Sequence, residues 1–142
     1  MAIIETSKVI NSSIENLWNI ISDVDRDPEY WHGTKSIKNI KKEGNIIERE
    51  TTISFKNSRC KEIITLDENN KNKIKIEIIE GPIQGEKTIT LEKIDTDSTK
   101  IAVTWNIKLK GAMAGLFTIF IKKHILKGTK EALERISSKS IE

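Results

Sequence analysis

Arg49 is the side chain with the clearest capacity for chemistry at a buried position. It shares the parity of Ile47 and Phe55 in a stretch of alternating apolar and polar residues, so it is expected to point into the interior. A buried guanidinium needs a partner, either the carboxylate or phenolate of a ligand or an internal glutamate such as Glu62 or Glu80. A bulge that turns Arg49 outward is a third alternative. Because charged residues are seldom fully buried, we prefer the internal pair or the bulge to a ligand anchor.

The two histidines and the single cysteine are weaker candidates. His124 lies on the flank of an apolar stripe, where it could exchange a proton with a ligand or simply border the core. His32 follows Trp31 and lies either near a pocket mouth or in a solvated loop. His32, Cys60 and His124 lack metal-ligand spacing, and the sequence has no nucleophile elbow or phosphate-binding glycine loop. We therefore expect no metal and no cofactor, and we assign no catalytic residue.

Aromatic residues supply candidate pocket walls. Trp105 shares a face with Val103 and Ile107, and it could stack on a planar ligand or pack in the core, which is the commoner role. Phe117, Phe120 and Ile121 are expected where the last helix faces the sheet. There they could line a pocket, join helix to sheet, or do both.

The elements that must position these residues follow from periodicity. Alternation over residues 35–110 predicts six antiparallel strands with one solvated face, and residues 3–10 predict a seventh. Ser12 and Glu15 form a capping-box pattern at the start of a short amphipathic helix, and Asp27 is expected to cap a second one that begins at Pro28.

A long helix is predicted over residues 112–138. Its apolar stripe would consist of Ala114, Phe117, Ile121, Ile125, Gly128, Ala132 and Ile136. Leu116, Ile119 and Leu126 lie on the opposite side, for which we consider packing against the short helices, a dimer or partner contact, and transient membrane contact. Packing is the simplest of these. This helix is the only predicted element long enough to cover the sheet. The order of elements therefore predicts an α+β fold with a ligand cavity between the curved sheet and the helix.

Length and composition fit one domain over residues 1–142. Apolar residues make up 37% and charged residues 32%, with a net charge of +3, which argues against disorder and against charge-driven nucleic-acid binding. One cysteine excludes a disulfide scaffold. The longest uncharged apolar-rich stretch, residues 111–121, is too short for stable membrane insertion, and no signal peptide is evident, so a cytoplasmic location is expected.

Several segments together resemble a known family. Residues 9–18 form a strand leading into a capped helix with a tryptophan, residues 21–24 precede the Pro28-Glu29-Tyr30-Trp31 segment, and a strand follows over residues 33–40. Gly81-Pro82, the strand from Thr99 and the closing helix over residues 111–136 complete the pattern. The chain resembles the START-like (SRPBCC, helix-grip) superfamily and is most similar to its polyketide cyclase/dehydrase and coenzyme Q-binding type. The resemblance implies a seven-stranded curved antiparallel sheet wrapped around a long C-terminal helix, with two short helices between strands 1 and 2. It also implies a pocket for a lipid, quinone, polyketide or similar small molecule.

We prefer the hypothesis of a non-enzymatic binder or carrier of a hydrophobic small molecule, as a monomer or weak homodimer. The predicted ligand-binding residues are Trp31, Arg49, Phe55, Ile76, Trp105, Phe117, Phe120, Ile121 and His124. The first alternative is a polyketide cyclase or dehydratase that uses His124, Tyr30 or Arg49 for proton transfer, which ranks lower because no convincing acid–base pair is evident. The second alternative is a protein-interaction module.

Overall fold

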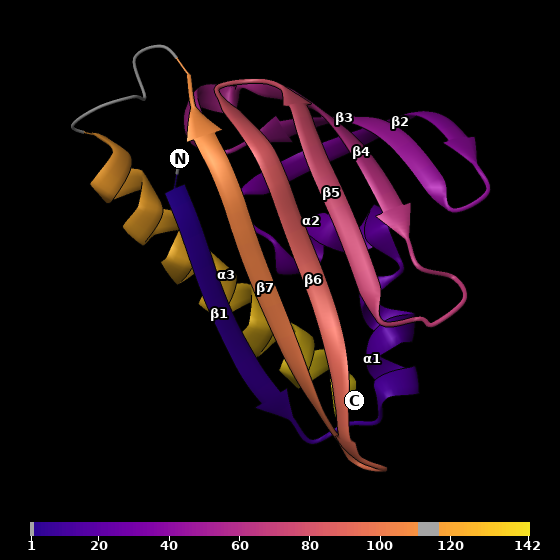
Figure 1. Cartoon of the computed structure of the whole chain (residues 1–142). Helices are drawn as coiled ribbons and strands as arrows, with labels where there is room; N and C mark the ends of the chain where they lie inside the picture. Colours follow the sequence, from indigo (N-terminus) through magenta and orange to yellow (C-terminus); the bar gives the residue numbers. More distant parts are fainter. Residues whose placement is uncertain (1, 111–116) are drawn as a thin grey trace.

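Seven strands form one antiparallel sheet in the order β1-β7-β6-β5-β4-β3-β2, as Figure 1 shows. The computed structural model describes residues 2–110 and 117–142, with the backbone alone at position 117. The strands are β1 (Ala2–Ile10), β2 (Thr34–Glu43), β3 (Ile46–Ile53), β4 (Arg59–Leu66), β5 (Lys73–Glu80), β6 (Ile83–Asp95) and β7 (Ser98–Leu109). Strands β2 to β6 each pair with the next strand along the chain, and β7 also pairs with β1. The predicted seven-stranded antiparallel sheet is confirmed.

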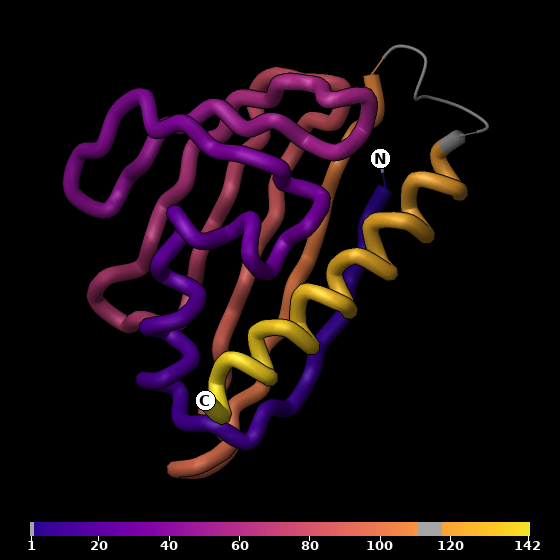
Figure 2. Tube along the Cα trace, turned by 180° about the vertical axis from the view of Figure 1, so that it is seen from behind, coloured from indigo at the N-terminus to yellow at the C-terminus, as the bar shows by residue number. Residues whose placement is uncertain are grey.

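The helices lie on one face of this sheet. The connection from β1 to β2 holds α1 (Ile14–Ile21), the 3-10 turn η1 (Val24–Arg26) and α2 (Asp27–Tyr30). The long helix α3 (Phe117–Ser140) lies over the β1 and β7 side and meets α1 near its C-terminal end (Figure 2). The predicted α+β helix-grip arrangement is therefore confirmed. The first residues of the predicted last helix, 112–116, lie outside the described part of the chain.

The start of α1 differs from the prediction by one residue. Ser13, not Ser12, is the N-cap, and its side chain accepts a hydrogen bond from the backbone N–H of Asn16 at 3.1 Å. Ser12 instead accepts from the side-chain amide of Asn16 at 2.7 Å, and the same amide donates to the backbone oxygen of Ser140 at 3.0 Å. Two adjacent serines can both cap a helix, so the local sequence does not distinguish them.

Phe55 is not a strand residue, although its parity places it in one. It begins the 3-10 turn η2 (Phe55–Asn57) between β3 and β4, in which Lys56 and Asn57 have positive φ values of 51° and 50°. These conformations reverse the chain and end the alternation at Ile53. Phe55 is half-buried beside the end of the sheet.

The buried side chains form two clusters. The main cluster joins the sheet to α1, α2 and the C-terminal half of α3, through residues such as Leu17, Ile64, Ile101 and Leu133. The second cluster, at the other end of α3, contains Ala2, Ile4, Ile107, Leu109 and Ile121. The two clusters meet at Ile83 and Trp105, which pack against both.

The rotation of α3 agrees with the predicted apolar stripe at Ile121, Ala132 and Ile136 and differs from it at Gly128. Ile121, Thr129, Ala132, Leu133 and Ile136 face inward and are buried. Phe120 is 67% exposed and His124 and Gly128 are exposed, whereas Leu126 is half-buried against the second cluster. The expectation that Phe120 faces the sheet is therefore wrong, because the buried arc of the helix lies about 100° or more away from it.

Candidate functional site

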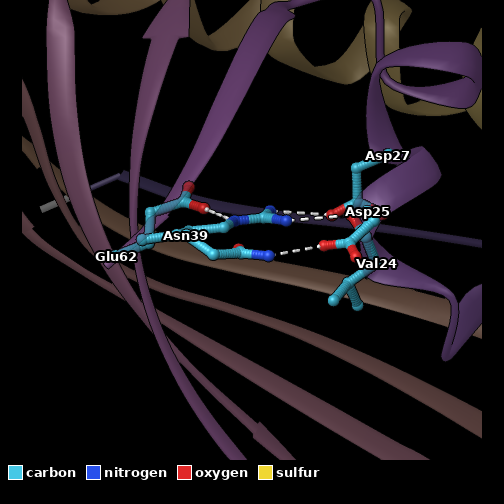
Figure 3. A network of polar contacts seen from close by, with 6 residues as sticks. Val24, Asp25, Asp27, Asn39 and Glu62 are labelled. Carbon is cyan, nitrogen blue, oxygen red and sulfur yellow. Dashed lines mark hydrogen bonds and ion pairs between the residues drawn. The ribbon is translucent and has the colours of Figure 1, made fainter. Parts of the chain in front are cut away.

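Arg49 lies at the centre of a buried polar network. Its side chain is 2% exposed, and its Nε donates to Glu62 Oε1 at 2.9 Å. Its Nη2 donates to Asp27 Oδ2 at 2.7 Å, and its Nη1 donates to the backbone oxygen of Val24 at 2.9 Å (Figure 3). The inward orientation and the internal pair with Glu62 are confirmed. Because the protein itself satisfies the guanidinium, a role for Arg49 in anchoring ligand stays a prediction.

Asp27 serves this network rather than a helix cap, so the cap prediction is wrong. The N-cap of α2 is Arg26, which makes no side-chain capping bond. Burial raises the pKa of the Asp27 carboxyl, and the charge and hydrogen bond of Arg49 oppose that rise. Burial disfavours the charge on Arg49 as well, yet Asp27 and Glu62 together hold its pKa above the ordinary value.

The network fastens the β1–β2 connection to the sheet. Val24 and Asp27 belong to η1 and α2, while Arg49 and Glu62 belong to β3 and β4. The side-chain amide of Asn39 on β2 adds a second tie by donating to Asp25 Oδ1 at 2.9 Å (Figure 3). These contacts hold α2, and with it Trp31, over the sheet.

Lys87 is a buried cation on β6 that the sequence analysis missed. It is 6% exposed, and its Nζ lies 3.0 Å from the ring centroid of Trp31 and 4.8 Å from that of Trp105. Lys87 forms no ion pair with any described residue. Burial lowers the pKa of Lys87 to about 7, although the charges of Asp27 and Glu62 work in the opposite direction. The amine is therefore part neutral and part protonated near neutral pH.

Trp31 and Trp105 form an aromatic pair around this amine. Their ring centroids lie 6.4 Å apart with an interplanar angle of 70°, an edge-to-face arrangement. Trp105 pairs directly with Lys87 across β6 and β7. Its Nε1 donates to Thr129 Oγ1 at 3.0 Å, and that hydroxyl donates to the backbone oxygen of Ile125 at 2.8 Å. The indole of Trp105 is thus fixed between the sheet and α3.

Partly exposed apolar side chains gather beside this pair. We define them as the apolar rim, and they come from η2, β6, β7 and α3. They are Phe55, Ile83, Trp105, Ile125 and Leu126. All pack against the second cluster, and Trp105 and Ile83 also pack against the main cluster. Through Trp105, which contacts Lys87, the rim is connected to the interior between the two clusters.

The structure brings some of the predicted binding residues together and separates others. Trp31 and Trp105 are in contact, Phe55 belongs to the rim, and Ile76 pairs with Lys87 across β5 and β6. Ile121 lies in the second cluster. Phe120 and His124 point away from this region, and the side chain of Phe117 lies outside the described part. Their binding roles stay predictions.

The alternation of inward and outward positions along β6 could have identified Lys87 as an inward-facing residue. It occupies the same face of β6 as Ile89 and Leu91, both buried, in the same way that Arg49 follows Ile47. Thr51 has the same parity as Ile47 and Arg49 on β3, and its hydroxyl is buried with no hydrogen-bond partner among the described residues. Asp27 could not have been assigned from local sequence, because its partners lie on β3 and β4.

The structure gives little support to metal or thiol chemistry. Within residues 2–110 and 117–142, no three His, Cys, Asp or Glu side chains gather as metal ligands. Burial raises the pKa of the Cys60 thiol to about 11, and Glu62 adds to the effect. Because the thiolate is the nucleophilic form, Cys60 is a poor nucleophile.

Comparison with known proteins identifies the family. The sequence pattern described as polyketide cyclase/dehydrase and lipid transport matches residues 10–134. This chain belongs to that family. The resemblance to the START-like superfamily is thereby confirmed, while a search of curated proteins finds no match.

Solved structures share the fold over almost the whole chain. TTHA0849 from Thermus thermophilus has a TM-score of 0.84 at 15% identity, covering 99% of this chain and 97% of that one. A START superfamily protein from Mycobacterium smegmatis has a TM-score of 0.79 at 13% identity, with 97% and 96% covered. The Zhui aromatase/cyclase from Streptomyces sp. R1128 has a TM-score of 0.77 at 12% identity, with 98% and 93% covered. At these identities the similarity establishes the fold alone.

Proposed function

We propose that this protein binds a hydrophobic small molecule between the sheet and α3, entering through the apolar rim. The observation that carries the proposal is the position of Trp105, which is half-buried in the rim and in contact with Trp31 and Lys87 inside. Apolar walls with one or two polar groups are typical of small-molecule sites. The family, which includes lipid-transport proteins and polyketide cyclases, supports the same ligand class.

The charges nearby favour a neutral polar group on the ligand. The two carboxylates, Asp27 and Glu62, already accompany the two cations, Arg49 and Lys87. An anionic ligand would add a buried negative charge that no further cation neutralises, at a high electrostatic cost. A ketone or quinone oxygen needs only a hydrogen-bond donor, which the Lys87 amine supplies in either protonation state. A lipid, quinone or polyketide bearing a carbonyl group fits these requirements.

Titration with the neutral dye N-phenyl-1-naphthylamine tests the proposal. The dye fluoresces in apolar surroundings, so the wild-type protein is expected to give saturable enhancement. Phe55→Ser and Ile125→Ser each remove rim surface and should weaken binding roughly tenfold, since burying such a side chain contributes about 1.5 kcal/mol or more.

Ile46→Ser is the matched control for this titration. Ile46 is 46% exposed on β3 and does not belong to the rim, so its replacement should leave the dye affinity unchanged. Absence of saturable binding by the wild-type protein, or equal weakening in Ile46→Ser, contradicts the proposal.

A second candidate function, a cyclase or dehydratase, is supported by Lys87. With burial bringing the pKa of Lys87 to about 7, the amine suits removal of a proton next to a ketone. Deuterium incorporation into 2-tetralone, followed by NMR, tests this chemistry. We expect an acceleration that rises with a midpoint near pH 7 and is lost in Lys87→Met. If wild-type protein gives no acceleration over buffer, this candidate is rejected while the binding function stands.

A further inference from the structure

The outer face of α3 carries large apolar side chains in solvent. Ile119 is 68% exposed and Phe120 is 67% exposed, and they are adjacent on the first turn of the helix. We define the outer face as these two residues together with Lys123, Leu126, Lys127 and Lys130, which recur at helical spacing. Such exposure costs free energy in an isolated domain, and a cluster of this kind is typical of an interaction surface.

The same face is strongly basic. Lys122, Lys123, Lys127 and Lys130 are all exposed, and the sequence contains no acidic residue between Asp97 and Glu131. Glu131 itself forms an ion pair with Arg135 at 3.3 Å, so its charge is locally compensated. The first half of α3 therefore presents apolar side chains amid lysines that form no ion pair with any residue in the described part of the chain.

A hollow lies on this face of α3. Its volume is about 310 Å³, and it is lined by Lys123, Leu126, Lys127, Lys130 and Glu131. Its lining is mostly apolar, while three lysines and Glu131 bring charged side chains to it. A phosphate-bearing headgroup has the charge for which such a site is suited, and the neighbouring Ile119 and Phe120 suit acyl chains.

We propose that the outer face of α3 docks on the surface of an anionic membrane. Ile119 and Phe120 would enter the boundary between headgroups and acyl chains, while the lysines contact anionic headgroups. The proposal places α3 on the membrane surface; among the described residues no helix is long and apolar enough to cross a bilayer. Charge complementarity selects an anionic membrane over a second copy of this chain, whose same face is also positive.

Docking would bring the proposed ligand entrance to the lipid. Leu126 lines the hollow and also belongs to the apolar rim. A hydrophobic ligand could then pass between bilayer and protein with little exposure to water. The docking itself does not require the ligand-binding proposal, because it depends only on the outer face.

Co-sedimentation with vesicles tests the inference on the full chain. We use phosphatidylcholine vesicles and vesicles in which part of the lipid is phosphatidylglycerol. Binding is expected only to the anionic vesicles and should weaken as salt is raised, because counterions screen the lysines. Lys123→Glu/Lys127→Glu should reduce the affinity at least tenfold, since each lysine near the surface contributes about a fivefold factor. Ile119→Ser/Phe120→Ser should reduce it similarly.

Matched variants control for charge and for stability. Lys38→Glu/Lys42→Glu changes the net charge equally on β2, and Ile94→Ser removes an isoleucine that is 53% exposed on β6. Both should bind anionic vesicles as the wild-type protein does. No binding to anionic vesicles, equal loss in the control variants, or a dimer that Ile119→Ser/Phe120→Ser disrupts would overturn the inference. The rim variants Phe55→Ser and Ile125→Ser should lose dye binding but still bind anionic vesicles. Failure of the ligand-binding proposal can therefore be told apart from failure of the membrane-docking proposal.

Discussion

Arg49 and Asp27 form a 2.7 Å ion pair that joins β3 to the short helix α2, across a separation of 22 positions in the chain. The pair is shielded from water, and Glu62 and the Val24 carbonyl complete the coordination of the guanidinium. Because α2 leads directly into Trp31, this network positions one wall of the proposed site. Its integrity should therefore matter for both stability and binding.

Removal of one partner from this network should be costly. Asp27→Ala leaves a buried guanidinium with one fewer carboxylate, and we expect a loss of about 3 kcal/mol in the free energy of unfolding. Asp25→Ala, two residues away, removes only an exposed hydrogen bond to Asn39 and should cost less than about 1 kcal/mol. Urea denaturation of the two variants checks the difference. Equal losses would show that the buried ion pair contributes no more to the free energy of unfolding than the exposed hydrogen bond does.

Lys87 should make stability depend on pH in a defined window. The pKa of Lys87 is about 7 in the folded protein and near 10.5 when unfolded. Between these values the unfolded chain binds more protons, so the free energy of unfolding should rise with pH. Lys87→Met abolishes this rise and should be more stable than the wild type by about 2 kcal/mol or more at pH 6, with the advantage shrinking towards pH 10.

Denaturation at several pH values measures this effect, with Lys108→Met as the control on the exposed side of β7. The control variant should follow the pH dependence of the wild-type protein. If Lys87→Met also follows it, the amine is not desolvated in the way the structure indicates.

Gly85 should not tolerate a side chain. Its φ is +135°, and a Cβ there would lie 2.2 Å from the backbone oxygen of Asn106 and 2.8 Å from the Cα of Ile107. Both contacts are with backbone of β7, so Gly85→Ala should cost about 3 kcal/mol and lower the melting temperature by roughly 10 °C. Gly33→Ala meets nothing within 4 Å and should change stability by less than about 1 kcal/mol. Calorimetry distinguishes the two, and a benign Gly85→Ala would contradict the described β6–β7 packing.

Alternation of apolar and polar residues was sufficient to predict the sheet and the inward face of its strands. Arg49 and Trp105 point inward as their parity requires, and Glu62 was among the partners considered for Arg49. Lys87 carries the same parity signal, so the alternation contained the information needed to place it inside. The position of Phe55 could not be predicted from this alternation. Residues with positive φ reverse the chain after Ile53, and the alternation of apolar and polar residues does not reveal such a reversal.

Local pattern predicts the buried stripe of α3 but not the orientation of its first turn, and it gives few of the long-range contacts. The stripe places Ile121 and Ile136 inward, as the structure has them, but apolar residues surround the first half of the helix, so the pattern places Phe120 inward as well. The structure buries Ile121 and exposes Phe120 and His124. Likewise, the pairing of Asp27 with Arg49 depends on how α2 folds back over the sheet, which no spacing along the chain encodes.

The indole N–H signals of the three tryptophans offer the most direct test of ligand binding. Trp31 and Trp105 line the proposed site, whereas Trp18 is buried on α1 in the main cluster and serves as an internal control. In a titration of ¹⁵N-labelled protein with N-phenyl-1-naphthylamine, the signals of Trp105 and Trp31 should shift and saturate while that of Trp18 stays in place. No shift at any of the three, or a shift confined to Trp18, would contradict a ligand site between the sheet and α3.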